Sequence, residues 1–171
     1  MNKFLPDMYQ KDIFSINYDK LKDNGIKVLL FDFDNTIMEK GAFIPDDKLI
    51  SFFKDLNKKF EVIILSNTLK KKKISNFCCK CGLKFMMRAM KPFSFGYKKV
   101  IKKRDKKIFA TIGDQLVTDV YGSKRLGLYT VLVDPVGLDD MKLTKINRKM
   151  ENILFKKLNK KFKFVKGEYY D

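Results

Sequence analysis

The sequence contains no histidine and no tryptophan, and only three of its 171 residues are cysteines. The absence of histidine excludes catalytic triads with an imidazole base, histidine phosphatases and zinc sites built on paired histidines. Any catalysis by this chain must therefore depend on carboxylates, lysines, hydroxyls or cysteines.

The cysteines lie close together, at Cys78, Cys79 and Cys81. They are too crowded for a disulfide framework, and without histidine or a second cysteine cluster they make a poor zinc site. A cysteine phosphatase loop needs an arginine six positions after the cysteine, but Arg88 lies seven positions after Cys81. We interpret all three as reduced cysteines at the end of a helix.

Long apolar runs and negative charge are also scarce. Residues 1–11 lack the apolar stretch of a signal peptide, and no run of about 18 apolar residues occurs anywhere. We therefore expect a soluble, cytoplasmic protein. The 37 Lys and Arg against 20 Asp and Glu give a net charge of 37 − 20 = +17, which favours anionic partners such as a lipid surface or RNA.

Four continuous apolar runs alternate with helical patterns along the chain. Such runs are typical of strands that are buried on both faces. They occupy residues 28–34, 62–67, 108–114 and 129–135, with a weaker strand at 84–87 and helical patterns at about 46–59, 70–81, 93–104 and 117–126. This order predicts one domain over residues 1–171, an α/β fold with a Rossmann-like parallel sheet between two helical layers.

The C-terminal residues 143–162 are predicted to form a basic amphipathic helix, because apolar residues recur there at three-and-four spacing. Two interpretations stay open: a helix packed on the domain with a solvated basic face, or a surface that meets anionic lipid or nucleic acid. The lysine-rich segments 70–73 and 98–107 are interpreted as solvated helix faces.

Two acids, Asp32 and Asp34, follow the first buried strand, where unpaired charge is costly. Magnesium would explain them, because Mg²⁺ prefers oxygen ligands and commonly bridges carboxylates to phosphate. A turn after the strand would let Asp32 and the Asp34 carbonyl bind the metal while the Asp34 side chain faces a leaving group. Asp114 ends the third run, and Asp119 lies five residues later, so both can point into the same pocket.

Polar residues follow two other predicted strands. Ser66 supplies a hydroxyl and Lys91 an ammonium group, the donors that a phosphoryl group needs for its non-bridging oxygens. Ligands of open α/β sheets bind at the carboxyl ends of the strands. The sequence therefore predicts a phosphoryl-transfer site at that edge.

These residues resemble, in order, the four motifs of the haloacid dehalogenase superfamily of aspartyl-phosphate phosphatases: Asp32-x-Asp34-x-Thr36, Ser66, Lys91 and Gly113-Asp114-x-x-x-x-Asp119. Nearly the whole chain is similar to the YqeG-type class III phosphatase family, a small bacterial group related to phosphatidylglycerophosphate phosphatases. The similarity includes Phe4-Leu5-Pro6-Asp7, Leu65-Ser66-Asn67, Lys91-Pro92 and the segment 112–120. Phe33 and Thr68 depart from the family pattern, which often has Leu and Asn at these positions.

The resemblance implies a Mg²⁺-dependent phosphomonoester hydrolase. Asp32 would be the nucleophile and Asp34 the general acid and base, with Lys91 as the third catalytic residue and Asp119 orienting Lys91 or a metal-bound water. We expect the phosphate group to be bound by Thr36, Ser66, Asn67 and Lys91. We expect Mg²⁺ to be bound by Asp32, Asp34, Asp114 and Asp119.

The sequence leaves no room for a cap domain, since only about ten residues separate Thr36 from the helix near Asp46. An open site suits a phosphate carried by something large. We expect phosphatidylglycerophosphate in an anionic membrane, with peripheral binding on its inner face through Phe4-Leu5-Pro6 and the basic C-terminal helix. Two alternatives stay open: a soluble phosphatase of small-molecule or protein phosphate, and an RNA- or ribosome-associated binding module.

Overall fold

The protein contains one sheet of six strands, all of which pair in parallel. The structure is a computed structural model that describes residues 2–39, 41–42, 44–137 and 142–171, except for the side chains of residues 142–148. The strand order is β1-β6-β5-β2-β3-β4. The strands are β1 (Met8–Gln10), β2 (Val28–Phe31), β3 (Glu61–Leu65), β4 (Lys84–Met86), β5 (Phe109–Gly113) and β6 (Tyr129–Val133). The predicted parallel α/β sheet is confirmed.

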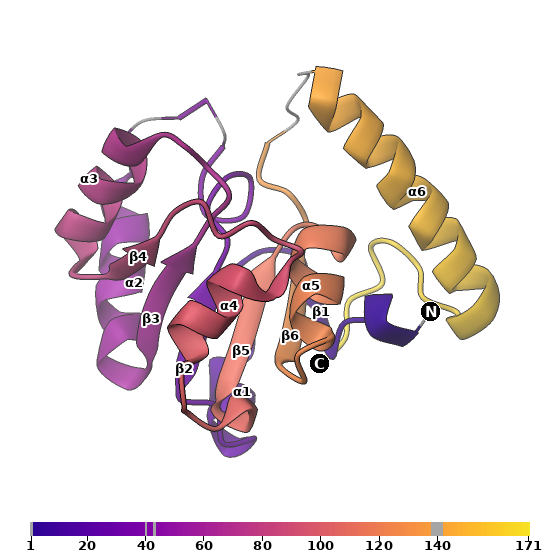
Figure 1. The fold of residues 1–171 in the computed structure, drawn as a ribbon, viewed down its shortest axis with the longest axis horizontal. Coiled ribbons are helices and arrows are strands. Elements are labelled where there is room, and N and C mark those ends of the chain that lie inside the picture. The colour runs from indigo at the N-terminus through magenta and orange to yellow at the C-terminus, as the bar shows by residue number, and fades with distance from the viewer. Residues whose placement is uncertain (1, 40, 43, 138–141) are drawn as a thin grey trace.

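Helices cover both faces of this sheet (Figure 1). They are α1 (Tyr18–Asp23), α2 (Asp47–Lys59), α3 (Lys71–Cys81), α4 (Ser94–Ile101), α5 (Gly122–Lys124) and α6 (Lys142–Phe162). Short 3₁₀ turns, η1 (Asn2–Phe4) and η2 (Lys106–Ile108), and a π-helical turn, η3 (Leu116–Tyr121), complete the fold.

Strand β2 shows how the sequence builds the layers, because all four of its residues are buried. Successive side chains of a strand point to opposite faces. Leu29 and Phe31 accordingly join the cluster that includes Phe53 of α2, whereas Leu30 joins the cluster that includes Tyr97 of α4. A central strand of this sheet therefore needs apolar residues at every position, because both of its faces are buried.

Helix α6 forms close to the predicted position and packs on the domain. Its Leu158 is fully buried in a third cluster with Tyr9 of β1. The chain then turns back, and Tyr170 makes an antiparallel bridge with Tyr9. The side chains of Leu143 and Ile146, predicted on the apolar face of this helix, lie outside the described residues.

Several details differ from the sequence-based expectation. β1 and α1 were not predicted, and the helix predicted at 117–126 is divided between the π-helical turn η3 and the single turn α5. The predicted reduced cysteines are confirmed, since Cys78 and Cys81 are buried free thiols at the end of α3 and Cys79 is exposed. In the described part of the chain, no helix combines the length and apolarity needed to cross a bilayer.

The strand order creates a topological switch point at β2. From β2 the chain builds β3 and β4 on one side, and later places β5 on the other side. The loop after β2 leads toward β3, and the loop after β5 leads toward β6, so these two loops diverge from each other. Open α/β sheets bind ligands at such a point of divergence.

Candidate active site

The predicted site residues gather at the carboxyl edge of the sheet, which is the upper edge in Figure 1. They lie on the loops after β2, β3, β4 and β5 and in η3: Asp32, Asp34, Thr36, Ser66, Asn67, Lys91, Asp114 and Asp119. Residues that are far apart in the sequence are thus brought together by parallel strands that end side by side.

Lys91 lies at the centre of this group. Its buried Nζ is 2.5 Å from Oδ1 of Asp32 and 2.5 Å from Oδ1 of Asp119. Burial lowers the pKa of Lys91, but the two carboxylates outweigh burial, so that the pKa lies above its ordinary value. Burial raises the pKa of Asp32 to about 6, against the opposing effect of Lys91. At neutral pH the pair is therefore an ammonium and a carboxylate.

Asp119 is held in place by its own turn. Its Oδ2 accepts hydrogen bonds from the Thr118 hydroxyl at 3.0 Å and from the Gln115 N–H at 3.3 Å. A Cβ at Gly113 would lie 2.3 Å from the Asp119 Cγ, so only glycine leaves room for this carboxylate. Asp119 forms an ion pair with Lys91, and its predicted role in orienting Lys91 or a metal-bound water stays a prediction.

Asn67 fixes the backbone that carries Lys91. Its Nδ2 donates to the Lys91 carbonyl at 2.8 Å, and its Oδ1 accepts the Lys91 N–H at 2.8 Å. The side chain of Asn67 thus positions Lys91, and its predicted contact with phosphate stays a prediction. The Oγ of the neighbouring buried Ser66 accepts the Thr68 N–H at 3.1 Å, and the predicted contact of Ser66 with phosphate stays a prediction.

Thr36 connects two carboxylates below the site. Its buried hydroxyl is 3.1 Å from Oδ1 of Asp114 and 3.4 Å from Oδ2 of Asp32. Burial, followed by the nearby charges of Asp32 and Asp119, raises the pKa of Asp114 well above its usual range. Three acids thus share a space in which negative charge is poorly solvated.

A divalent cation fits this donor set. One carboxylate oxygen each from Asp32, Asp114 and Asp119 lies within 4.8 Å of the others. Hard oxygen donors of this kind suit Mg²⁺, and its charge would offset the carboxylates that Lys91 alone leaves unbalanced. The side chain of Asp34 is not part of this cluster, and its predicted metal contact, through the backbone carbonyl, stays a prediction.

Asp34 instead pairs with a buried lysine that the sequence alone predicts to be exposed. Lys73 was interpreted as part of a solvated helix face, yet its side chain is 1% exposed. Its Nζ lies 3.0 Å from Oδ1 of Asp34 and 2.9 Å from the Glu39 carbonyl oxygen. Lys73 stands four residues before the buried Phe77 on α3, and this spacing is the one signal that places it on the inner helix face.

Comparison with known proteins identifies the relatives of this chain. No family model matches it. A curated relative from Bacillus subtilis (strain 168), described as the probable phosphatase YqeG, is 34% identical over 161 residues, which cover 92% of this chain and 93% of the relative. The chain belongs to the YqeG family. The predicted resemblance to this group of haloacid dehalogenase-type phosphatases is therefore confirmed.

Solved structures agree with this assignment at the level of the fold. A putative haloacid dehalogenase hydrolase of Bacillus subtilis, YfnB, whose structure contains magnesium, is 14% identical with a TM-score of 0.52 over 69% of this chain and 91% of its own. An uncharacterized protein from Listeria monocytogenes serotype 4b is 14% identical with a TM-score of 0.51 over 77% of this chain and 99% of its own. The YqeG-family chain thus has the superfamily's α/β fold.

Proposed function

We propose that the protein is a Mg²⁺-dependent phosphomonoester hydrolase that forms an aspartyl phosphate at Asp32, and that its substrate is phosphatidylglycerophosphate in an anionic membrane. The observation that carries the hydrolase proposal is the Asp32 carboxylate, held by Lys91 beside two further acids. A carboxylate fixed in this way can act as a nucleophile at neutral pH.

In the first step, an oxygen of Asp32 attacks phosphorus in line, and the bond from phosphorus to the substrate oxygen breaks. This route divides a slow hydrolysis into two easier reactions. The Lys91 ammonium orients Asp32, and it lies where it can also attract the equatorial phosphate oxygens as charge develops. The Ser66 hydroxyl supplies a second donor to those oxygens.

Asp34 moves the protons. It protonates the leaving oxygen and then, as a carboxylate, takes a proton from the water that cleaves the aspartyl phosphate. Its side chain is 20% exposed, more than that of Asp32, so it can face both substrate and water. Lys73 holds one carboxylate oxygen of Asp34, its Oδ1, at 3.0 Å.

Magnesium would be held by Asp32, Asp114 and the Asp34 carbonyl, with Asp119 close to this set. When bound, it neutralises phosphate charge that would otherwise repel an anionic nucleophile.

Two features support a lipid substrate: the lack of a cap domain over the site and the positive net charge of the chain. The connections after β2 and β3, residues 32–46 and 66–70, are too short to contain a separate cap domain, so we expect a phosphate on a large carrier to reach the site. Each Lys or Arg near an anionic bilayer contributes about 1 kcal/mol, and the chain carries a net charge of +17. Lysine is a point charge that attracts phosphate groups without fixed geometry, whereas recognition of RNA bases favours the paired hydrogen bonds of arginine. A lysine-rich surface therefore favours general attraction to phosphate. We accordingly propose a peripheral location on the inner face of the membrane.

The test compares wild type with Asp32→Asn on a panel of phosphatidylglycerophosphate vesicles, sugar phosphates, nucleotides and phosphopeptides, with and without Mg²⁺. We expect Asp32→Asn to lower turnover by a factor on the order of 10³ or more, because the amide is a poor nucleophile and metal ligand. Chelation of Mg²⁺ should do the same reversibly.

Three outcomes would contradict the proposal. Wild-type turnover by Asp32→Asn would exclude the covalent mechanism. Preference for a soluble phosphate without activity on vesicles would exclude the lipid substrate. No turnover on any phosphate, together with tight, salt-sensitive RNA binding that Asp32→Asn leaves unchanged, would favour the binding module.

A further inference from the structure

The most exposed large apolar side chains of the described residues lie at one edge of the molecule. Ile44 is 78% exposed, Leu69 69%, Phe93 64% and Met90 55%, and Val136 is half exposed. Single exposed apolar residues are ordinary on protein surfaces. Here, however, the four most exposed ones share an edge, and we call these five residues the apolar rim.

The rim belongs to the loops that carry the active site. Ile44 follows β2, Leu69 follows β3, Met90 and Phe93 follow β4, and Val136 follows β6, so all five lie beyond the carboxyl ends of parallel strands. This is the edge at which the candidate active site opens.

Hydrogen bonds hold the rim loops together around the site. The Val136 N–H donates to the Asn35 carbonyl at 2.8 Å, and the Ala89 N–H donates to the Ser66 carbonyl at 3.0 Å. Met90 directly precedes Lys91 in the sequence. A surface that touches the rim would therefore face the proposed nucleophile.

Positive charge flanks the rim on one side. Lys71 and Lys72 are exposed at the start of α3, beside Leu69, and Arg88 is exposed two residues before Met90. Two exposed acids, Asp46 and Asp47, lie at the start of α2, which packs beside α3. Apolar side chains that project from loops between cations match the chemistry of an anionic lipid surface, which takes apolar groups below its headgroups and cations at them.

We infer that the apolar rim inserts into an anionic bilayer and thereby places the active site against the phosphate of a lipid headgroup. The inference rests on the proposed lipid-phosphate function and specifies the surface that meets the membrane. It replaces the expected contact through Phe4-Leu5-Pro6, because Phe4 stacks on Tyr121 at 4.5 Å between ring centroids, Leu5 packs against the third cluster, and Pro6 is buried.

Two other surfaces serve as controls. Met150 and Ile153 of α6 are also exposed, and they line an apolar groove with Phe4 and Tyr121. The groove lies against α6, the basic helix that was the second expected membrane contact.

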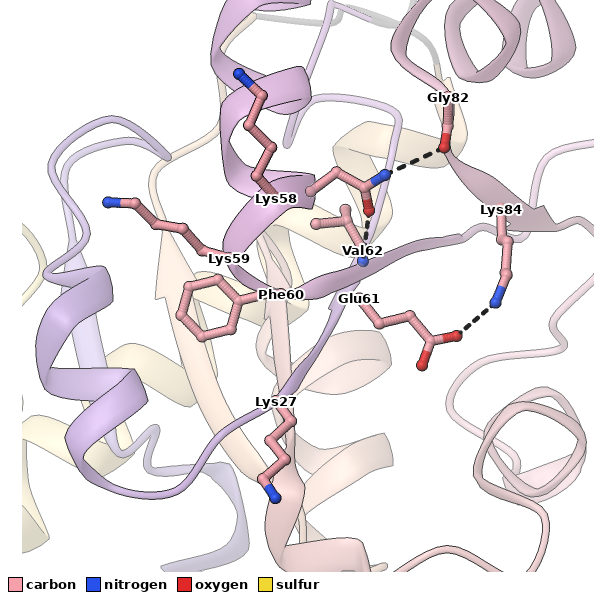
Figure 2. A pocket seen from close by; sticks show the side chains of 9 residues that line it. Lys27, Lys58, Lys59, Phe60, Glu61, Val62, Gly82 and Lys84 are labelled. Atoms are coloured by element: carbon pink, nitrogen blue, oxygen red, sulfur yellow. Dashed lines mark hydrogen bonds and ion pairs between the residues drawn. The ribbon is translucent and has the colours of Figure 1, made fainter.

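The second control lies at the amino ends of β2, β3 and β4, opposite the active site. Figure 2 shows Lys27, Lys58 and Lys59 pointing away from one another around a hollow there, while Lys84 reaches Glu61. Lys58→Gln with Lys59→Gln removes the same charge as Lys71→Gln with Lys72→Gln. The five residues of β3, at about 3.3 Å each, separate the two pairs by more than the Debye length of about 8 Å.

The experiment measures binding to phosphatidylglycerol vesicles by sedimentation at 0.15 M salt, with each variant's fold checked by thermal unfolding. We expect Ile44→Ser, Leu69→Ser and Phe93→Ser each to weaken binding roughly tenfold. We expect Lys71→Gln with Lys72→Gln to weaken it by roughly fivefold per cation. Lys58→Gln with Lys59→Gln, and Met150→Ser with Ile153→Ser, should change it less than about twofold.

Two outcomes would overturn the inference. Wild-type binding by the rim variants, with a loss in Met150→Ser with Ile153→Ser, would assign the contact to α6. The wild type could instead fail to bind vesicles and form a dimer, measured by analytical ultracentrifugation. If Leu69→Ser dissociated that dimer, the rim would be assigned to a second copy of the chain.

Hydrolysis is measured separately, on vesicles that contain phosphatidylglycerophosphate. If vesicle binding depends on the rim but the lipid is not hydrolysed, the docking surface is supported and the proposed substrate is wrong. Hydrolysis of the lipid by a wild type whose binding does not depend on the rim overturns the docking surface and leaves the proposed function intact.

Discussion

Lys91 joins two carboxylates that have different roles in the proposed reaction. Asp32 attacks phosphorus, whereas Asp119 lies 2.5 Å from the same ammonium and is fixed by its own turn. Both contacts are buried, so carboxylates hold the Lys91 ammonium on two sides. The nucleophile is therefore oriented before the phosphate arrives, which reduces the reorganisation that the reaction requires.

Lys73 provides the corresponding anchor for Asp34, and its effect can be measured. We expect Lys73→Met to lower kcat by about 10- to 100-fold on a soluble aryl phosphate, with KM within about threefold, because a misplaced proton donor affects mainly the transition state. Lys80→Met removes an exposed lysine from the same helix and should leave both constants unchanged. Equal losses in the two variants, or an unchanged kcat in Lys73→Met, would show that the Lys73 contact does not position Asp34.

At the scale of elements, the parts that the sequence predicts are those whose signal is local. Each central strand is a run of apolar residues, and acids at the end of such a run are costly without a ligand, so β2 and Asp32 are evident from their neighbours alone. β1 has only three residues, and its burial depends on β6 and on Tyr170, far along the chain. The ion-pair partner of Lys73, Asp34, likewise lies 39 residues away in the sequence. Such long-range contacts have no periodic pattern.

Glu151 joins α6 to η3, and it makes this contact dependent on pH. The Val117 N–H donates to Glu151 Oε1 at 3.3 Å, and burial raises the pKa of Glu151 to about 7. An acid whose folded-state pKa is raised keeps its proton longer in the folded state, so stability falls as pH rises from about 4.5 to 7.

The substitution Glu151→Gln tests this dependence, because glutamine keeps the acceptor oxygen without the charge. We expect it to increase the free energy of unfolding at pH 8 by at most about 3 kcal/mol, and to have little effect at pH 4.5. Urea unfolding at both pH values measures the difference. A gain of the same size at both would show that charge is not the cause.

For the whole molecule, the excess of 17 positive charges works against compactness, while the site edge concentrates negative charge in Asp32, Asp114 and Asp119. The two effects respond to different ions. Monovalent salt screens the general repulsion between cations. A divalent cation bound by Asp32 and Asp114 would connect the loops after β2 and β5, and would stabilise only the folded state.

Thermal unfolding separates these two contributions. We expect added NaCl to raise Tm by a few degrees in wild type and in Asp114→Asn alike, because screening acts on the whole surface. MgCl₂ at matched ionic strength should raise the wild-type Tm further: at a hundredfold excess over Kd, binding adds about 2.7 kcal/mol, or roughly 5–11 °C for a chain of this length. Asp114→Asn lacks one of the three carboxylates and should lose this additional rise while it keeps the response to NaCl. If NaCl and MgCl₂ gave equal shifts in wild type, the carboxylate cluster would not be a magnesium site, and its acids would have to be balanced by Lys91 alone.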